Sequence, residues 1–315
     1  MSAGGARSSV RAFAPASVGN VAIGFDILGF ALGVLGDTVR IQRRERPGVT
    51  IEAIRGVAGE LPRAAEDNTA GRALLALADA VRAPFGFAVE IDKGIPLGSG
   101  LGGSAASAVA AVVAANALLP EPCTQLELLK FAMAGEAVAS GDRHVDNIAP
   151  SLFGGLVLTV GIDHPRVKQI PVPRGIRAIV VHPHMSIATS KARAILKESV
   201  RLSDFVWQTA NLAGFISGCY TDDLDMIRAS FEDVVIEPQR QALIPGFQAV
   251  RRAALEAGAL GCSISGAGPS MFAWAATERA PAVRAAMRAA FAAAGLASDD
   301  WIVELQSAAG AHLLG

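Results

Sequence analysis

Several features that would decide a function class are scarce in this sequence. Its 315 residues include three cysteines, Cys123, Cys219 and Cys262, which lie far apart. An odd number of widely spaced cysteines favours a reducing compartment and argues against a disulfide framework or a zinc site. The five histidines show no metal-ligand spacing, and we interpret His182 and His184 as structural or solvated residues.

Net charge and long apolar runs are lacking as well. The formal net charge is −1, so no basic surface favours nucleic acid or an anionic membrane. The longest apolar run, residues 105–119, is interrupted by Asn116 and is short for a membrane span. No charged segment followed by an apolar stretch opens the chain in the manner of a secretion signal. We therefore expect a cytoplasmic protein that binds neither nucleic acid nor membrane.

The composition, 51% hydrophobic and 18% charged, is that of a globular protein, and 315 residues are enough for two domains. Strand and helix patterns mix in both halves, which indicates an α+β fold with a boundary near residues 160–170. The expected strands are 11–16, 38–44, 49–54, 87–91, 156–160, 176–182, 261–265, 270–274 and 301–305. The expected helices are 68–82, 105–119, 124–140 (with a Thr124–Glu127 capping box), 188–197, 203–220, 224–231, 244–257 and 281–294.

The most informative segment is residues 96–107, which hold four glycines and three serines directly before a predicted helix. Such a loop presents backbone N–H groups and the positive end of a helix dipole to an anion, for which phosphate is the natural candidate. A glycine turn with Ser104 as helix N-cap is the structural alternative. Neither common nucleotide motif fits. No lysine follows the glycines as in Walker A. The dinucleotide fingerprint belongs in the first strand–helix unit, whereas this loop comes late and the next acidic residue, Glu121, lies beyond the predicted helix in a turn with proline.

A second glycine-punctuated segment, residues 14–29, follows the first predicted strand. It places Ser17, Asn20 and Asp26 on an irregular path. Asn20 and Asp26 either close local side-chain turns, which is the interpretation that they favour by themselves, or bind an ammonium or hydroxyl group of a small substrate.

Glu136 lies among apolar residues of the helix predicted over 124–140. A carboxylate in such surroundings needs a cation, since burying it unpaired is costly. Mg²⁺ bound by one carboxylate, one hydroxyl and nucleotide phosphates meets that need, and Glu136 with Ser104 would supply the protein ligands. A solvated position on the helix surface is the simpler alternative.

Two further segments concentrate polar residues and glycine. Residues 141–150, with His144, Asp146 and Asn147, form either a polar loop with local hydrogen bonds or part of a site. The Ser-Gly-Ala-Gly-Pro-Ser run at 265–270 is either a hairpin connection or a second glycine turn beside the nucleotide phosphates.

Two arginines stand in comparable polar blocks. Thr189 and Arg193 lie four residues apart and therefore share a helix face. Arg193 and Arg240 would form a carboxylate clamp if both point at one place, and they are surface charges otherwise.

Taken together, these motifs resemble the superfamily of galactokinase, homoserine kinase, mevalonate kinase and phosphomevalonate kinase, the GHMP kinases. An opening segment with proline and glycine, the phosphate loop and a late Gly-Ala-Gly turn occur in the order of that superfamily. Within it the resemblance is to the homoserine kinases and runs from about residue 10 to near the C-terminus. The blocks that carry it are residues 14–29, His144-x-Asp146-Asn147-x-Ala149-Pro150, Thr189-x-x-x-Arg193 and Glu237-Pro238-x-Arg240.

The resemblance implies an N-terminal domain, residues 1–165, like domain 2 of ribosomal protein S5, and a ferredoxin-like C-terminal domain, residues 166–315, with the site in the cleft between them. It implies transfer of phosphate from ATP to the side-chain hydroxyl of L-homoserine, a step of threonine biosynthesis. Ser104 and Glu136 would bind Mg²⁺. ATP would be bound by Asn68 and by the phosphate loop: Pro96, Leu97, Gly98, Ser99, Gly100, Leu101, Gly102, Gly103, Ser104, Ala105 and Ser107.

The resemblance also implies roles around the amino acid. Asn20 and Asp26 would meet its ammonium and hydroxyl side, Arg193 and Arg240 would bind its carboxylate, and the remaining pocket residues would be Thr189, His144 and Asn147. The expected catalytic residues are Asn147, Arg193, Ser104 and Glu136.

Some relatives use an aspartate as base, and the matching acidic residue here, Asp146, either does so or orients its loop. A homodimer is expected from the family alone. The alternatives are another GHMP small-molecule kinase and a GHMP-fold protein that binds a ligand without turnover.

Overall fold

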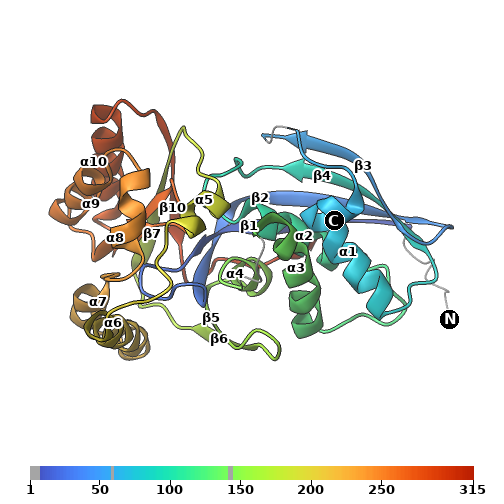
Figure 1. The fold of residues 1–315 in the computed structure, drawn as a ribbon, viewed down its shortest axis with the longest axis horizontal. Coiled ribbons are helices and arrows are strands. Elements are labelled where there is room, and N and C mark those ends of the chain that lie inside the picture. Colours follow the sequence, from blue (N-terminus) through green and yellow to red (C-terminus); the bar gives the residue numbers. More distant parts are fainter. Residues whose placement is uncertain (1–7, 58–59, 141–144) are drawn as a thin grey trace.

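A mixed sheet, built mainly from the first half of the chain, is covered by helices (Figure 1). The structure, a computed structural model, describes residues 8–57, 60–140 and 145–315. Within these residues the sheet has seven strands, in the order β11-β1-β2-β4-β3, with β5 beside β2 and β6 beside β5. The pair β3–β4 is parallel and the other pairs are antiparallel. The strands are β1 (Ser9–Gly19), β2 (Leu28–Arg44), β3 (Val49–Gly56), β4 (Gly86–Lys93), β5 (Leu156–Val160), β6 (Arg166–Ile170) and β11 (His312–Leu314).

The helices of this half pack on one another and on the sheet. They are the 3₁₀ turn η1 (Ala65–Asp67), α1 (Thr69–Ala80), α2 (Gly103–Asn116), α3 (Gln125–Ser140) and α4 (Ile148–Phe153). Alanine and valine fill α2 on nearly all sides because that helix is buried between β1, β2, α1 and α3. The predicted capping box is confirmed: Thr124 N–H donates to Glu127 at 2.7 Å, and Glu127 N–H donates back to the Thr124 hydroxyl at 3.3 Å.

The second half forms an antiparallel sheet in the order β10-β7-β9-β8, with α9 and α10 packed against it. Its elements are β7 (Ile176–Pro183), α5 (Thr189–Ala194), α6 (Leu202–Thr221), α7 (Leu224–Ser230), α8 (Glu237–Arg240), η2 (Gln241–Leu243), α9 (Phe247–Glu256), β8 (Gly261–Ile264), β9 (Met271–Ala276), α10 (Ala280–Ala293) and β10 (Ser298–Glu304). Among the described residues, no helix combines the length and apolarity that a membrane span requires.

The predicted strands and helices are present, most with shifted ends. The strand predicted over 38–44 is the second part of the longer β2, and the helix predicted over 244–257 begins only after Gly246, whose φ of 79° interrupts it. Sequence reasoning missed β6, β11, α4 and α8. These elements span three to six residues, which is too short for a periodic pattern, and α4 contains Pro150.

The two sheets do not separate at residues 165/166. β6 begins at Arg166 yet pairs with β5, and β11 at the end of the chain pairs with β1. The first sheet therefore takes strands from both sides of the expected boundary. A mixed α+β architecture with two sheets is what the structure shows.

Aromatic side chains fill the junction between the two halves. The Phe30 ring of β2 lies 5.5 Å from Phe272 and 6.0 Å from Trp274, both on β9. The Phe215 ring of α6 lies 5.1 Å from Trp274, and the Phe231 ring contacts that of Phe272. Phe30, Phe215, Phe272 and Trp274 are fully buried, so this cluster fixes how the two sheets face one another.

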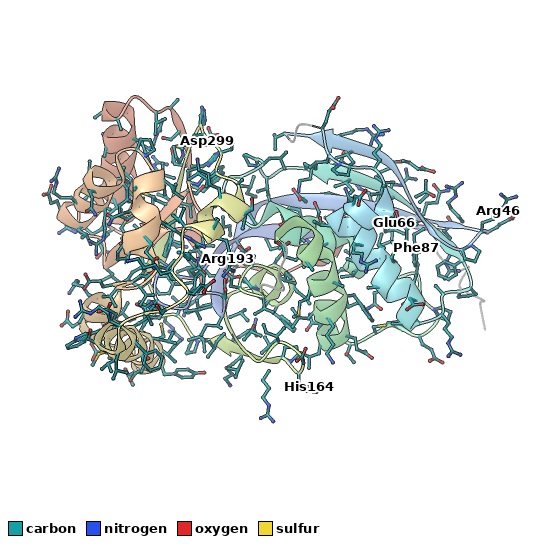
Figure 2. The ribbon with its side chains drawn as sticks, viewed as in Figure 1. Arg46, Glu66, Phe87, His164, Arg193 and Asp299 are labelled. Atoms are coloured by element: carbon teal, nitrogen blue, oxygen red, sulfur yellow. The ribbon has the colours of Figure 1, made fainter. Side chains whose placement is uncertain are left out.

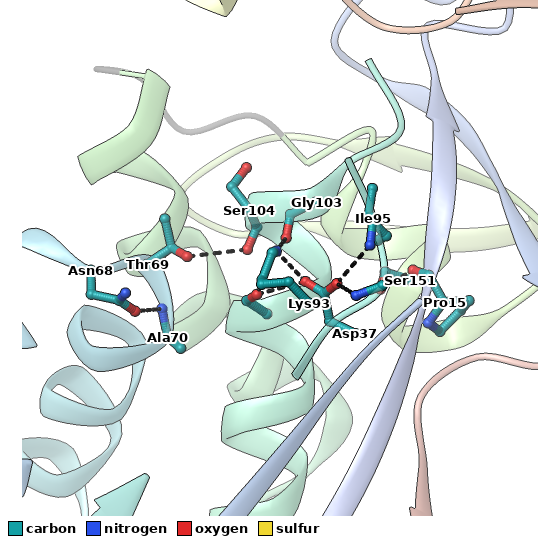
Figure 3. Close-up of polar contacts among 12 residues, drawn as sticks. Pro15, Asp37, Asn68, Thr69, Ala70, Lys93, Ile95, Gly103, Ser104 and Ser151 are labelled. Carbon is teal, nitrogen blue, oxygen red and sulfur yellow. Dashed lines mark hydrogen bonds and ion pairs between the residues drawn. The ribbon is translucent and has the colours of Figure 1, made fainter. Parts of the chain in front are cut away.

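A buried ion pair lies beneath the start of α2 (Figure 3). The Lys93 ammonium contacts the Asp37 carboxylate and donates to Gly103 O at 2.7 Å and Ser107 Oγ at 2.8 Å. Ser107 donates to Asp37 at 2.6 Å, and the other Asp37 oxygen accepts backbone N–H bonds from residues 94 and 95 at 3.0 and 3.2 Å. Because every charged atom has a partner, the cluster ties two strands to the first turn of α2.

Removing one member of this pair is expected to cost more stability than removing both charges. Lys93→Met leaves the buried Asp37 charge uncompensated and should lower the free energy of unfolding by about 3–5 kcal/mol. The double variant Lys93→Met/Asp37→Asn should recover much of that loss. Denaturant unfolding measures both, and Arg228→Met, which breaks the exposed Arg228–Asp225 pair, is the control, with an expected loss below about 1 kcal/mol. Equal losses in the single and double variants would show that charge compensation is not what the pair provides.

Candidate active site

The glycine-rich loop before α2 takes backbone angles that its glycines make accessible. Gly98, Gly100 and Gly102 have φ of 63°, 76° and 67°. A Cβ on Gly100 would lie 2.5 Å from Ser265 O, and one on Gly102 would lie 2.4 Å from Ser17 Oγ. The loop therefore needs glycine both for its turns and for its contact with neighbouring segments.

The carbonyl groups of this loop bond to elements on both sides of it. Gly98 O accepts from the backbone of residue 187 at 2.9 Å and Leu101 O accepts from that of residue 17 at 3.1 Å. Ser99 O accepts from Ser270 Oγ at 2.6 Å, and Gly100 O accepts from Ser265 Oγ at 2.7 Å. The late turn at 265–270 is thus both a hairpin connection between β8 and β9 and a support of the loop.

Helix α2 begins two residues earlier than an N-cap at Ser104 would require. Gly102 is the N-cap and makes no side-chain capping bond, so the structural alternative that gave this role to Ser104 is wrong. A left-handed Gly102 lets the chain turn sharply into the helix, which places Ser104 in the first turn. From there the Ser104 hydroxyl donates to Glu136 Oε1 at 2.9 Å.

Two carboxyl groups near this helix are buried. Burial raises the pKa of Glu136 to about 7, against the opposing effects of the Ser104 hydrogen bond and the Lys93 charge. Burial also raises the pKa of Asp146 to about 7, with the Asp26 and Glu136 charges adding to the rise. Each carboxyl would be stabilised as an anion by a cation in the adjoining cavity.

The segment after β1 is a turn closed by Asn20. Its side-chain oxygen accepts the Asp26 N–H at 3.0 Å, and its amide donates to Gly266 O at 3.0 Å. Asn20, Val21, Ala22 and Asp26 all have positive φ, which is strained for the β-branched Val21. The turn interpretation is confirmed for Asn20, whereas the Asp26 carboxylate pairs with Arg193, and both residues line a cavity.

Arg193 reaches that cavity from α5. Its guanidinium donates to both Asp26 oxygens at 2.9 Å in a bidentate pair, and Figure 2 shows Arg193 near the middle of the molecule, between the two halves. Arg240 is 3% exposed and donates to Ala192 O and Gly266 O, each at 3.1 Å. The two guanidinium carbons lie 4.9 and 5.2 Å from the Phe25 ring centre.

One cavity collects most of the predicted site residues from both halves of the chain. Its lining comprises residues 96–104 and Asn20, Asp26, Glu136, Asp146, Asn147, Thr189, Arg193, Arg240, Gly266 and Ala267. A neighbouring, more apolar cavity is lined by Leu61, Pro62, Asp67, Asn68, Thr69, Ile91, Lys93, Leu97, Ser104 and Ser107. Ala105 is fully buried in α2, and His144 lies outside the described residues.

Asn147 faces the phosphate loop. Its side-chain oxygen accepts from Ser17 Oγ at 3.0 Å, and its amide approaches Asp146 Oδ2 at 3.4 Å. A Cβ on Gly19 would lie 2.2 Å from Asp146 Oδ2, so the missing side chain there gives both residues their room.

Asp37 and Lys93 were not predicted, although the sequence holds a signal for them. Asp37 shares the inward strand face with Val39 and Ile41, and Lys93 shares one with Phe87, Val89 and Ile91. A charged residue at an inward position of a strand predicts a buried pair. Ser265 and Ser270 had no comparable signal, because their hydroxyl partners are backbone carbonyls distant in sequence.

Comparison with known proteins places this site in a family. Residues 68–155 match the GHMP kinases N terminal domain and residues 215–293 match GHMP kinases C terminal. A homoserine kinase of Xylella fastidiosa strain M12 is 53% identical over 96% of this chain and 94% of its own length. One of Chlorobium phaeovibrioides is 45% identical over 93% and 96%.

Comparison with solved structures supports the same family. The crystal structure of homoserine kinase from Cytophaga hutchinsonii covers 100% of both chains with a TM-score of 0.95 and 42% identity. L. major mevalonate kinase in complex with R-mevalonate shares the fold at a TM-score of 0.69 and 17% identity, covering 96% of this chain and 98% of its own. The chain therefore belongs to the GHMP kinases and, within them, to the homoserine kinase family.

Proposed function

We propose that this protein transfers the γ-phosphoryl group of ATP to the side-chain hydroxyl of L-homoserine, giving O-phospho-L-homoserine in threonine biosynthesis. One observation carries the proposal. A single cavity has a glycine-rich loop at a helix start on one wall and, on another, a carboxylate with two guanidinium groups. The first suits a triphosphate and the second suits the two charges of an amino acid.

ATP is assigned to the loop and the adjoining apolar cavity. The carbonyl groups of residues 98–101 bond elsewhere, so the loop can turn its N–H groups toward phosphate oxygens at the positive end of α2. Leu61, Pro62 and Leu97 offer an apolar surface to the adenine. Asn68 caps α1 with its side-chain oxygen and donates to Pro62 O at 2.9 Å, which supports a role in shaping the adenine pocket.

Mg²⁺ is assigned to Ser104 and Glu136. Their hydrogen-bonded hydroxyl and carboxylate face the cavity and are oxygen ligands of the kind that Mg²⁺ takes together with phosphates and water. The burial that raises the Glu136 pKa favours a cation beside that carboxylate, so the residues present fit the ion. When bound, Mg²⁺ would neutralise charge on the phosphate groups.

Homoserine is assigned to the opposite wall. Asp26 and Asn20 would meet its ammonium and hydroxyl side, and Arg193 with Arg240 its carboxylate. Thr189 and Asn147 line the same cavity, and His144 is proposed from the resemblance alone.

The reaction depends on positioning and charge neutralisation. The substrate oxygen forms the new O–P bond, the bond between the γ-phosphorus and the β–γ bridging oxygen breaks, and the hydroxyl proton is released. Asn147 would orient the hydroxyl. Asp146, beside the Asn147 amide, is proposed as a positioning residue.

We further propose that the first sheet with its helices corresponds to an S5 domain 2-like domain and the second to a ferredoxin-like domain. The expected ranges 1–165 and 166–315 then describe them except for β6 and β11, which join the first sheet. A cytoplasmic location is supported by the free cysteines at 123, 219 and 262.

A homodimer is proposed as well. Leu202, Phe205, Val206 and Trp207 at the start of α6 are each more than half exposed, and an apolar cluster of this kind is typical of an interface. Sedimentation equilibrium should give twice the chain mass, and Trp207→Lys should shift the protein toward the monomer. A monomeric wild-type protein at micromolar concentration would exclude the proposal.

Turnover should require homoserine. ADP release with ATP and Mg²⁺ is expected with L-homoserine but not with mevalonate, galactose or no acceptor. Arg193→Ala should raise the KM for homoserine about 100-fold with a much smaller change in kcat and in the KM for ATP, because it removes one arm of the carboxylate clamp. Arg228→Ala, at an exposed pair outside the cavity, is the control.

Turnover with another alcohol would support kinase activity but exclude L-homoserine as the substrate. ATP binding without turnover on any acceptor would favour the ligand-binding alternative.

Glu136→Gln should weaken the dependence on Mg²⁺ specifically. The amide can keep the Ser104 hydrogen bond but supplies no charge, so the Mg²⁺ concentration for half-maximal activity should rise about tenfold or more. Glu127→Gln, at the exposed start of the same helix, is the matched control. Equal Mg²⁺ dependence in the variant and the wild type would remove Glu136 from the metal site.

A further inference from the structure

The two groups assigned to opposite ends of the substrate bind each other in this structure. Arg193 Nη1 lies 2.9 Å from Asp26 Oδ2, and Nη2 lies 2.9 Å from Oδ1 and 3.0 Å from Oδ2. This is the fork geometry that a guanidinium makes with any carboxylate, including that of an amino acid. Both side chains are about one-third exposed, at 31% and 32%, so the pair faces the cavity.

The arginine pair needs an anion before any substrate arrives. Arg193 and Arg240 share the Phe25 ring, and burial together with the Arg193 charge lowers the pKa of Arg240. The Arg240 hydrogen bonds go to backbone carbonyls, which carry dipoles rather than a negative charge. Asp26 is an anion that favours the charged form of Arg240 and pairs directly with Arg193.

Asp26 is held in this position by its backbone. It has a φ of 63°, and its N–H is bound by Asn20, whose amide donates to Gly266 O. The same carbonyl accepts from Arg240 Nη1 at 3.1 Å. The acidic and basic sides of the site are therefore fixed to one another through a single carbonyl group, and the pair is a built feature of the cavity.

We propose that Asp26 is an internal stand-in for the substrate carboxylate, so that a ligand enters by charge-pair exchange. This rests on the proposed function. An incoming amino acid breaks the Asp26–Arg193 pair and supplies a carboxylate to the arginines and an ammonium to Asp26 together. A ligand with only one of these charges breaks the same pair but returns a counter-charge to only one of the two residues. The site therefore disfavours ligands with a single charge in addition to attracting zwitterions.

The exchange differs from an additive clamp in one measurable consequence. In an additive clamp, neutralising Asp26 removes an ammonium contact and changes the binding of a bare carboxylate only through a loss of charge repulsion, which added salt weakens. In the exchange, neutralising Asp26 releases Arg193, so a bare carboxylate binds more tightly than it does to the wild type. A gain of binding of this kind does not follow from a merely structural role of Asp26.

Isothermal titration with 4-hydroxybutyrate, which is homoserine without its ammonium, tests the proposal on the full chain. Asp26→Asn should bind 4-hydroxybutyrate about tenfold more tightly than the wild type does, and L-homoserine more weakly. Asparagine accepts a positive φ as readily as aspartate, which protects the turn. Asp225→Asn, the same change at the exposed Asp225–Arg228 pair, should alter neither affinity. An unchanged or weaker affinity of Asp26→Asn for 4-hydroxybutyrate would overturn the exchange.

A second variant, which removes the charge of Arg193 instead of that of Asp26, tests the proposal without the Asp26 substitution. Arg193→Gln should release Asp26 and tighten the binding of 3-aminopropan-1-ol, which is homoserine without its carboxylate, by a similar factor. No gain in this arm would also count against the exchange. Homoserine turnover by the wild type separates the two proposals, because turnover without either gain rejects only the exchange, whereas its absence rejects the proposed function.

Discussion

The site depends on how the carbonyl groups of the phosphate loop are bound. Four consecutive carbonyls, from residue 98 to residue 101, accept hydrogen bonds from β1, from the segment before α5 and from the turn between β8 and β9. A glycine-rich loop by itself would have many conformations, and ordering it costs more entropy than ordering other residues. These bonds select one conformation, and because they come from both halves of the chain, the loop is fixed only when the two sheets are in place.

Two ion pairs at the site compensate charge inside the fold. Lys93 pairs with Asp37 beneath the loop, and Arg193 pairs with Asp26 across the cavity. The two pairs have different roles because their side chains differ in solvent exposure. Asp37 and Lys93 are almost fully buried with every charged atom bonded, so that pair is structural. Asp26 and Arg193 are about one-third exposed and face the cavity, so that pair is open to the exchange proposed above.

The sequence predicted most elements and the residues that meet in the cavity, because the motifs are contiguous and their chemistry is local. It did not predict that Asp26 and Arg193, 167 residues apart, pair with each other, since that contact depends on how α5 packs against the turn after β1. Ser104 shows the same limit at short range. The position of Ser104 beside glycine is also compatible with a helix cap. Because Gly102 is left-handed and caps the helix, Ser104 lies in the first turn, where it donates a hydrogen bond to Glu136.

The fold by itself does not choose the substrate. A mevalonate kinase shares this architecture at 17% identity, so the fold alone does not identify the substrate. What can differ is the wall opposite the loop, where Asp26 comes from one half of the chain and Arg193 from the other. Mevalonate has a carboxylate but no ammonium, so by the proposed exchange it would take Arg193 from Asp26 without supplying a cation in return. Under the proposed exchange, selectivity against such acids would follow from Asp26, the acidic residue that pairs with Arg193.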